Sequence, residues 1–531
     1  MEAGALAERN TFQGERCIYN ALNDRIRNLL LQYDFSKSSD PNVYWSSHLS
    51  SLIDGKLSDI SLSAGQHEFS LHKFVLASRT PYFSKKLRAQ PETASWKLAS
   101  GIPAEAFRVA LRYVYLGDLP RDLAPAGSSL DEQEVLTGLD KISKQLEIEQ
   151  LWEAILISND RRMARQRYQD EVERAIAQFG SFFTENVLGK KMIVDIDRVN
   201  EVKWKHDNST FSDILLRADE PIVEDEDDME VDWEPEESGN IPVGPAGTAQ
   251  PSSDGQHKPR KSVLYPTHRA MLLRSEYFSR MFSGDFVETQ VSTHLRVVTL
   301  DCSPQVLEAI LRFLYTENTD SITLDIALDL LYAADMLFLD SLKTKAAIAI
   351  STLGSAPPTM TEDGMQVEPI NIYDVIHAAW DLRVQRLEEF AARYLANRLE
   401  YYIEDDDFAD LIRESAGRLK KREETDTIEL LDDIRYYLGE RFRQRFEDTG
   451  LGDVLDETRA ASYKDADKTS AEATPAVDVD MLDETEAQPK SNEEALREAQ
   501  DEGDEFTSDQ LNYEMLHSKI DLMLEKLKLG A

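Results

Sequence analysis

Few residues in this chain have a type and spacing that could do chemistry. The segment from His67 to His72, His-Glu-Phe-Ser-Leu-His, has one residue more than the His-Glu-x-x-His pattern of zinc hydrolases. The sequence contains no Gly-x-Gly-x-x-Gly and no Walker Gly-Lys-Ser/Thr, so no loop is predicted to cradle a phosphate. It also lacks the Gly-x-Ser-x-Gly elbow of serine hydrolases.

The chain has two cysteines, Cys17 and Cys302. They cannot make a disulfide framework or a four-cysteine zinc site, and this usage fits a reducing compartment. Neither has the basic or helix-start setting that would favour a thiolate, and we expect Cys302 to be a small buried group at a strand end. Carboxylates are plentiful, but those on disordered segments cannot be positioned for acid–base work. We therefore expect a non-enzyme without metal or cofactor.

The formal net charge is -40, and two segments hold most of the excess. Asp219 to Asn240 has 12 acidic residues and no basic one, and Glu447 to Phe506 has 20 acidic and 5 basic residues. Neither has a hydrophobic period, so we expect both to be disordered. A pI near 4.6 opposes binding to nucleic acid or to an anionic membrane.

No signal peptide is expected at the N-terminus, and no apolar run is long enough to span a membrane. The expected location is cytoplasmic. The nuclear alternative stays open, since the basic cluster from Lys258 to Lys261 is short.

Two parts of the sequence repeat each other. The alternating segment Leu57 to Leu62 recurs as Phe211 to Leu216, which predicts two half-buried strands. His-Lys-Phe-Val-Leu from His72 matches His-Arg-Ala-Met-Leu from His268, and a Tyr-Phe-Ser triplet follows in each copy. The second copy has 42 extra residues between its Asp and His, and we place this acidic insert in a turn between strands.

Helical patterns follow in both copies. An amphipathic helix is predicted after Pro103 in the first copy and after Ser303 in the second, where Ser303 is an N-cap and Pro304 the first helical residue. A further helix is predicted over Val135 to Ile157 and over Ile326 to Ile350. Each copy is thus expected to be a small sheet wrapped by helices.

The repeated string of Asp-Ile, His-x-x-x-Leu, Tyr-Phe and a helix ending near a tyrosine resembles the BTB/POZ domain, here in two copies. The double arrangement is similar to that of the ankyrin repeat and BTB/POZ domain-containing proteins, although no Thr-Pro-Leu-His ankyrin motif is present. The resemblance implies an α+β fold with structural roles for Asp59, His72, Tyr82, Asp213, His268 and Tyr277. In that fold His67 to His72 crosses from strand to helix, so the rings would not converge on a metal. His72 and His268 would form hydrogen bonds at a helix start.

The expected organisation has six parts. They are a helical lead-in over 1–56, a first BTB/POZ domain over 57–180, a second over 211–350 with a disordered acidic insert at 219–261, a BACK-like helical domain over 371–446, an acidic linker over 447–506 and a C-terminal helix over 507–529. In the last helix, Tyr513, Leu516, Ile520, Met523 and Leu527 form a short heptad seam. We expect it to dock on the helical domain, the alternative being an intermolecular coiled coil.

The resemblance also implies a function, that of a substrate adaptor for a cullin-3 RING ubiquitin ligase with an unknown client. Such adaptors carry an apolar-x-Glu element, which Phe286-Val287-Glu288 matches in the second copy, and Tyr315 is the corresponding aromatic on the later helix. Leu87 to Glu92 of the first copy gives no clear match. The first copy would instead serve dimerisation, intramolecular pairing or client contact.

Three other functions compete with the adaptor function. A non-catalytic BTB scaffold without ligase linkage remains the runner-up, with its copies paired inside the chain or in a homodimer. A zinc-finger transcription regulator lacks Cys-x2-Cys and His-x3-His spacings and has the wrong charge. A channel tetramerisation domain lacks a membrane span.

Overall fold

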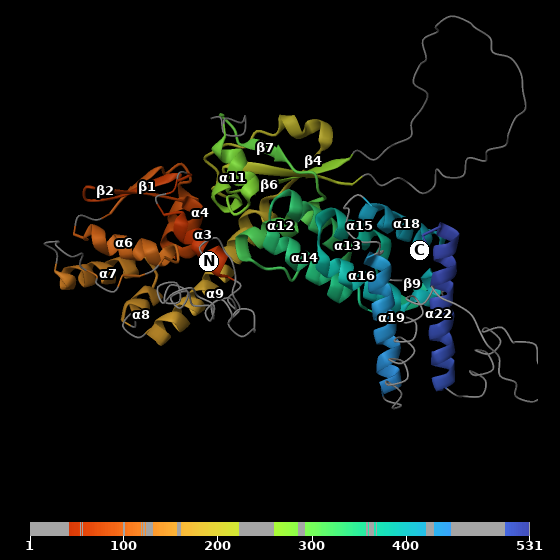
Figure 1. The fold of residues 1–531 in the computed structure, drawn as a ribbon. Helices are drawn as coiled ribbons and strands as arrows, with labels where there is room; N and C mark the ends of the chain where they lie inside the picture. Colours follow the sequence, from red (N-terminus) through yellow and green to blue (C-terminus); the bar gives the residue numbers. More distant parts are fainter. Residues whose placement is uncertain are drawn as a thin grey trace, which may run out of the picture. The chain divides into compact units, whose positions relative to one another are not determined.

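The structure is a computed structural model that describes residues 42–53, 55, 57–98, 101–117, 119–120, 123, 131–156, 161–221, 260–284, 292–356, 359–360, 366–367, 369–420, 429–447 and 505–529. It forms two compact units (Figure 1). The first comprises the chain up to Ile322 together with Asp329–Lys343, and the second comprises Thr323–Leu328 and the chain from Thr344 onward. The sheets of both repeat copies belong to the first unit.

The first copy is built on a three-stranded sheet of order β2-β1-β3. Strand β1 (Ile60–Ala64) pairs antiparallel with β2 (His67–Leu71) and parallel with β3 (Ser95–Lys97). Alternate residues of β1 are buried, as the apolar–polar pattern predicted. The helices of this copy are α3 (Val43–Ser51), α4 (Lys73–Arg79), α5 (Pro81–Ala89), α6 (Ala104–Val114), α7 (Glu132–Leu146) and α8 (Gln150–Leu156).

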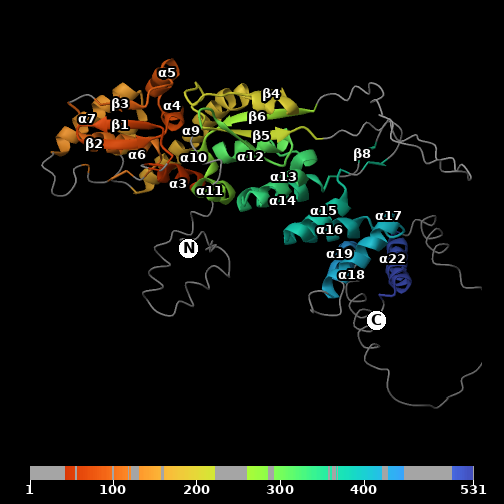
Figure 2. The same cartoon turned by 90° about the horizontal axis from the view of Figure 1, so that it is seen from above.

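The second copy repeats this sheet and adds a strand to it. Strand β5 (Ile214–Asp219) pairs antiparallel with β6 (Lys261–Thr267) and parallel with β7 (Arg296–Thr299), while β4 (Met192–Asp195) pairs with the outer edge of β6 (Figure 2). Because β5 and β6 are consecutive antiparallel partners, the insert lies in the turn between them, as predicted. Residues 222–259 of the insert lie outside the described residues.

Helix α9 (Arg161–Asn186) connects the copies and runs past residue 180, where we expected the first domain to end. The turns η2 (Leu188–Lys190) and η3 (Ile196–Glu201) flank β4. The helices after β6 are α10 (Arg269–Leu272), α11 (Glu276–Ser283), α12 (Pro304–Thr316), α13 (Leu324–Met336) and α14 (Asp340–Leu353). At the start of α12 the Ser303 hydroxyl accepts a hydrogen bond from the Val306 N–H and Pro304 is the first helical residue, which confirms the predicted N-cap.

The prediction of one long helix at the end of each copy is wrong. Residues 135–157 contain most of α7 and all of α8, and residues 326–350 contain parts of α13 and α14. Each break falls at a residue with left-handed backbone, Glu147 with φ 58° and Phe338 with φ 53°. The following N–H then bonds five residues back, Ile148 to Ser143 and Leu339 to Ala334, which closes a Schellman-type helix end.

The second unit is helical, as the apolar stripes predicted. It contains α15 (Ile372–Leu382), α16 (Gln385–Asn397), α17 (Leu399–Tyr402), α18 (Asp406–Lys420), α19 (Glu429–Glu447) and α22 (Glu505–Leu527), with two-residue strands β8 (Thr359–Met360) and β9 (Gln366–Val367). Helix α22 packs on α18 and α19 and buries Leu516 and Ile520. The Arg435–Asp521 ion pair and the Phe442–Tyr513 ring contact lie beside the heptad seam of α22. Helix α22 therefore docks on the helical domain of its own chain.

Candidate protein-interaction surface

Equivalent aspartates start equivalent helices in the two copies. The Asp59 carboxylate accepts a hydrogen bond from the Lys73 backbone N–H at 2.7 Å, and the Asp213 carboxylate accepts one from the Arg269 N–H at 2.8 Å. Each bond satisfies a helix-start N–H that has no partner inside its own helix. The aspartates thereby tie the first strand of each copy to the helix that follows the second strand.

His72 and His268 are the buried N-cap residues of α4 and α10. The Tyr115 hydroxyl accepts a hydrogen bond from the His72 backbone N–H at 2.9 Å, and Tyr315 does the same for His268 at 3.1 Å. Burial lowers the pKa of both imidazoles to about 4. The neutral imidazole rings of both histidines therefore bond to the tyrosines at the ends of α6 and α12.

The Tyr-Phe pair of each copy anchors its next helix. Tyr82 and Tyr277 are half-buried, and each lies edge-on to the following phenylalanine, with ring centroids 5.2 Å apart in the first copy and 5.3 Å in the second. The phenylalanines Phe83 and Phe278 are fully buried. The tyrosines therefore lie at the boundary between core and solvent.

The two copies pair with each other inside the first unit. Phe74 of α4 stacks on His268 with ring centroids 4.4 Å apart. The Trp45 indole N–H donates to the Tyr315 carbonyl oxygen at 2.9 Å, and the His48 ring lies 2.8 Å from the Ala270 carbonyl oxygen. The aromatic faces of α3 and α4 are thus covered by the second copy, which is one of the two expected arrangements, the other being a homodimer.

The three residues predicted to contact cullin have different outcomes. Phe286 and Glu288 lie outside the described residues, beyond the end of α11 at Ser283. Tyr315 has 0% exposure, and its hydroxyl is bonded to His268. The prediction of a partner contact for Tyr315 is therefore corrected, because its ring is enclosed by α9 and α10 and cannot reach another protein.

A surface that we did not predict lies next to α11. Tyr332, Met336 and Phe338, at 39%, 37% and 53% exposure, are named here the apolar face. Helices α7 and α13 end in the same hydrogen-bond pattern, which aligns the two copies residue by residue. The matching positions of the first copy hold Lys141, Gln145 and Glu147. A comparison of the two copies, position by position in this alignment, would have revealed the apolar face from the sequence.

The helix beside this surface, α5 in the first copy and α11 in the second, also changes from an ionic contact to an aromatic one. In the first copy Lys85 of α5 makes an ion pair with Glu147 at 3.0 Å. At the matching place in the second copy, the Arg280 guanidinium lies over the Phe338 ring, 5.7 Å from its centroid. One face of the same fold is therefore ionic in the first copy and aromatic in the second. Apolar side chains left exposed together mark interaction surfaces.

Potential metal ligands and one cysteine bear on possible chemistry in the described part of the chain. Within it, no group of three His, Cys, Asp or Glu residues could hold a metal ion. Cys302 is half-buried just after β7, and burial raises the pKa of its thiol to about 12, so the thiolate is disfavoured. None of the helices described is long and apolar enough to cross a membrane.

Comparison with known proteins agrees with the repeated fold. The BTB/POZ domain family matches residues 49–155 and 260–352. BTB/POZ domain-containing protein 3 of Schizosaccharomyces pombe is 34% identical over 466 residues, which cover 86% of this chain and 75% of that protein. An ankyrin repeat-containing protein of Saccharomyces cerevisiae is 30% identical over 470 residues, 85% of this chain and 81% of that protein. Kelch-like protein 40 of Homo sapiens is 32% identical over 77 residues, 14% of this chain and 12% of that protein.

The sheet topology, the paired Asp, His and Tyr contacts and the two family matches therefore lead to one assignment, which is that this chain belongs to the BTB/POZ domain-containing proteins and carries two copies of a protein-interaction domain.

Proposed function

We propose that this protein is the substrate-recognition subunit of a cullin-3 RING ubiquitin ligase and that its second BTB/POZ copy faces the cullin. The observation that carries the proposal is the apolar face beside α11. Helix α11 leads into the Phe286-Val287-Glu288 element, and its Arg280 already lies over Phe338 of the apolar face. The face and the element would form one contact region.

The contrast between the copies supports the choice of the second copy. Exposed Tyr, Met and Phe side chains lose water-accessible area when a partner covers them, and aromatic anchors dominate interface energies. The first copy presents Lys, Gln and Glu at the same positions, which would lose hydration in a buried interface. One fold with two such surfaces is suited to hold different partners on its two copies.

The carboxylate of Glu288 would complete the contact region. Because an apolar knob and a charge recognise a partner by different forces, the pair gives specificity beyond what the apolar face provides. The guanidinium of Arg280, which pairs with Glu276 in the chain, would then lie at the rim, where a partner carboxylate could compete for it.

A scaffold without ligase linkage is the second candidate. The intramolecular pairing favours it, since Phe74, Trp45 and His48 join the copies without any partner. A scaffold would use the apolar face for some other protein and would leave cullin unbound.

The test is a titration of the purified cullin-3 N-terminal domain with the full chain. The decisive variant gives the second copy the residues of the first, Tyr332→Lys, Met336→Gln and Phe338→Glu. These types occupy the same positions of the same fold in the first copy, so folding should be kept. Losing two or three anchors of about 2 kcal/mol each predicts at least a hundredfold loss of affinity.

Two further variants provide a second test and a control. Phe286→Ala with Glu288→Ala should weaken binding similarly, whereas Lys141→Ala, Gln145→Ala and Glu147→Ala in the first copy should leave it intact. Absence of binding by the wild-type chain would favour the scaffold. Unchanged affinity of the second-copy triple variant would refute the assignment of the face.

A further inference from the structure

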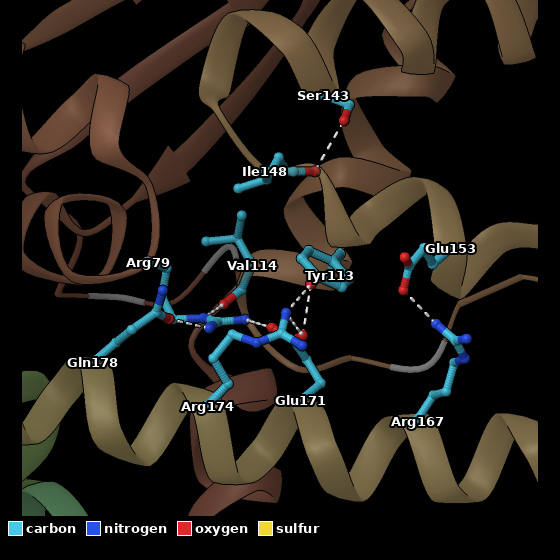
Figure 3. A network of polar contacts seen from close by, with 10 residues as sticks. All are labelled: Arg79, Tyr113, Val114, Ser143, Ile148, Glu153, Arg167, Glu171, Arg174 and Gln178. Carbon is cyan, nitrogen blue, oxygen red and sulfur yellow. Dashed lines mark hydrogen bonds and ion pairs between the residues drawn. The ribbon is translucent and has the colours of Figure 1, made fainter.

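A buried polar network joins the connecting helix α9 to the first copy (Figure 3). Arg79, at the end of α4, is 3% exposed, and its guanidinium pairs with Glu171 of α9. The same carboxylate accepts hydrogen bonds from the Tyr113 hydroxyl at 2.6 Å and from Arg174 at 2.6 Å. Gln178, two turns further along α9, also bonds to Arg79.

The second copy contains an equivalent arginine, which also pairs with a carboxylate. Arg274 occupies the position of Arg79, and both reach carbonyl oxygens at the end of the long helix, Arg79 at Val114 and Arg274 at Phe313 and Leu314. The carboxylate partner of Arg274 is Glu317, which follows α12 in the same copy. Both pairs are buried, with side-chain exposures of 2% and 10% in the first copy and 8% and 5% in the second.

The first copy has a glycine at the position of Glu317. Counted from the tyrosines Tyr115 and Tyr315, Gly117 matches Glu317 and carries no charge. A buried guanidinium without a charged partner is strongly destabilising. The connecting helix therefore supplies, from beyond the family match that ends at residue 155, the carboxylate that the second copy carries just after α12.

The other end of α9 belongs to the pairing of the two copies. Phe179 contacts the rings of Trp45 and Phe74 at centroid distances of 5.4 and 6.3 Å. Phe182 lies 5.6 Å from His268, and Phe183 lies 5.1 Å from Tyr315. Glu171 and these three phenylalanine rings therefore lie on one continuous helix.

We propose that Glu171 is a positioning residue through which α9 completes the first BTB/POZ copy and couples it to the second, so that the two copies are one cooperative unit. The fixed mutual orientation would not depend on which partners the copies bind, so the proposal stands apart from the cullin assignment. The folded unit of the first copy then extends through α9, beyond residue 155 where the family match ends.

Amide hydrogen exchange of the full chain, read by mass spectrometry, tests the coupling. Glu171→Gln should lower protection at least a hundredfold in α4 and α6, and it should also lower protection in α12 of the second copy. The matched variant Glu317→Gln removes a buried carboxylate from a pair inside the second copy. Because coupling is reciprocal, it should speed exchange in α10 and α12 and also in α4 and α6. Wild-type protection of α4 and α6 in Glu171→Gln would overturn the proposal, and so would an effect that never reaches α12.

A milder variant covers the case in which Glu171→Gln fails to fold. Tyr113→Phe keeps the Arg79–Glu171 pair and removes one hydrogen bond to its carboxylate, which predicts about a tenfold loss of protection. The loss should appear in α6, in α9 and in α12. A loss confined to α6 would contradict coupling through α9.

Discussion

Acidification should weaken the contact between the two BTB/POZ copies through His268. Its Nε2 lies 2.9 Å from the Thr210 carbonyl oxygen, which can only accept, so Nε2 carries the proton of the neutral ring. Nδ1 then accepts from the Tyr315 hydroxyl at 2.6 Å, and that hydroxyl accepts from the His268 backbone N–H. A proton on Nδ1 would place two donors against each other.

The magnitude follows from linkage. Burial lowers the folded-state pKa of His268 to about 4, below the ordinary value of 6.5. The unfolded chain binds the proton first, so the contribution is complete above pH 6.5 and is lost as the pH falls toward 4. At pH 4.5 the loss is about 2.5 kcal/mol for His268, and His72, which has the same lowered pKa, should lose a similar amount. A charged ring stacked on Phe74 would recover only about 1 kcal/mol.

The assay is urea unfolding of the full chain at pH 7 and pH 4.5, followed by tryptophan fluorescence. Trp45, one of six tryptophans, is fully buried and donates to Tyr315, so part of the signal comes from the contact between the copies. His268→Gln should be less stable than wild type at pH 7 but should lose about 2.5 kcal/mol less on acidification. Equal losses in wild type and variant would refute the reasoning, since His268 would then not be the group that takes up the proton.

Three further predictions concern the architecture. The chain of 60.3 kDa should be a monomer in light scattering because its two copies cover each other, and a mass of about twice that value would indicate a homodimer. Deleting Glu224 to Ser253 should leave the thermal midpoint unchanged or slightly higher, because the β5–β6 ladder from Ile214 to Asp219 lies outside the deletion; loss of a cooperative transition would argue against this. Leu516→Ala with Ile520→Ala should release α22 at a cost of about 2–5 kcal/mol per side chain and make it sensitive to proteolysis, whereas Leu522→Ala, at 56% exposure, should have little effect.

Local sequence patterns predicted which helices and strands form better than they predicted where the helices end. The β1 strand, the Ser303 N-cap and the position of the insert follow from side-chain alternation, a capping residue and matching spacings. Strand β5 forms at the repeated segment, but its first three residues are all buried and do not alternate. The breaks at Glu147 and Phe338 were missed, because neither residue is a glycine, the residue type that most often signals a left-handed helix end. The apolar stripes continue across both breaks, so periodicity alone favoured longer helices.

The sequence by itself determined that the chain repeats one small α+β unit, that the second unit carries an acidic insert, and that a BTB/POZ resemblance runs through both. These properties depend only on residue spacing and side-chain type along a continuous segment of the chain. Only the tertiary structure decided that Tyr315 is buried and that Glu171 pairs with Arg79, 92 positions away. It also decided that Phe338 is exposed beside Arg280. Burial and ion pairing depend on which elements pack together, and residues distant in the chain meet only when the two copies close on α9.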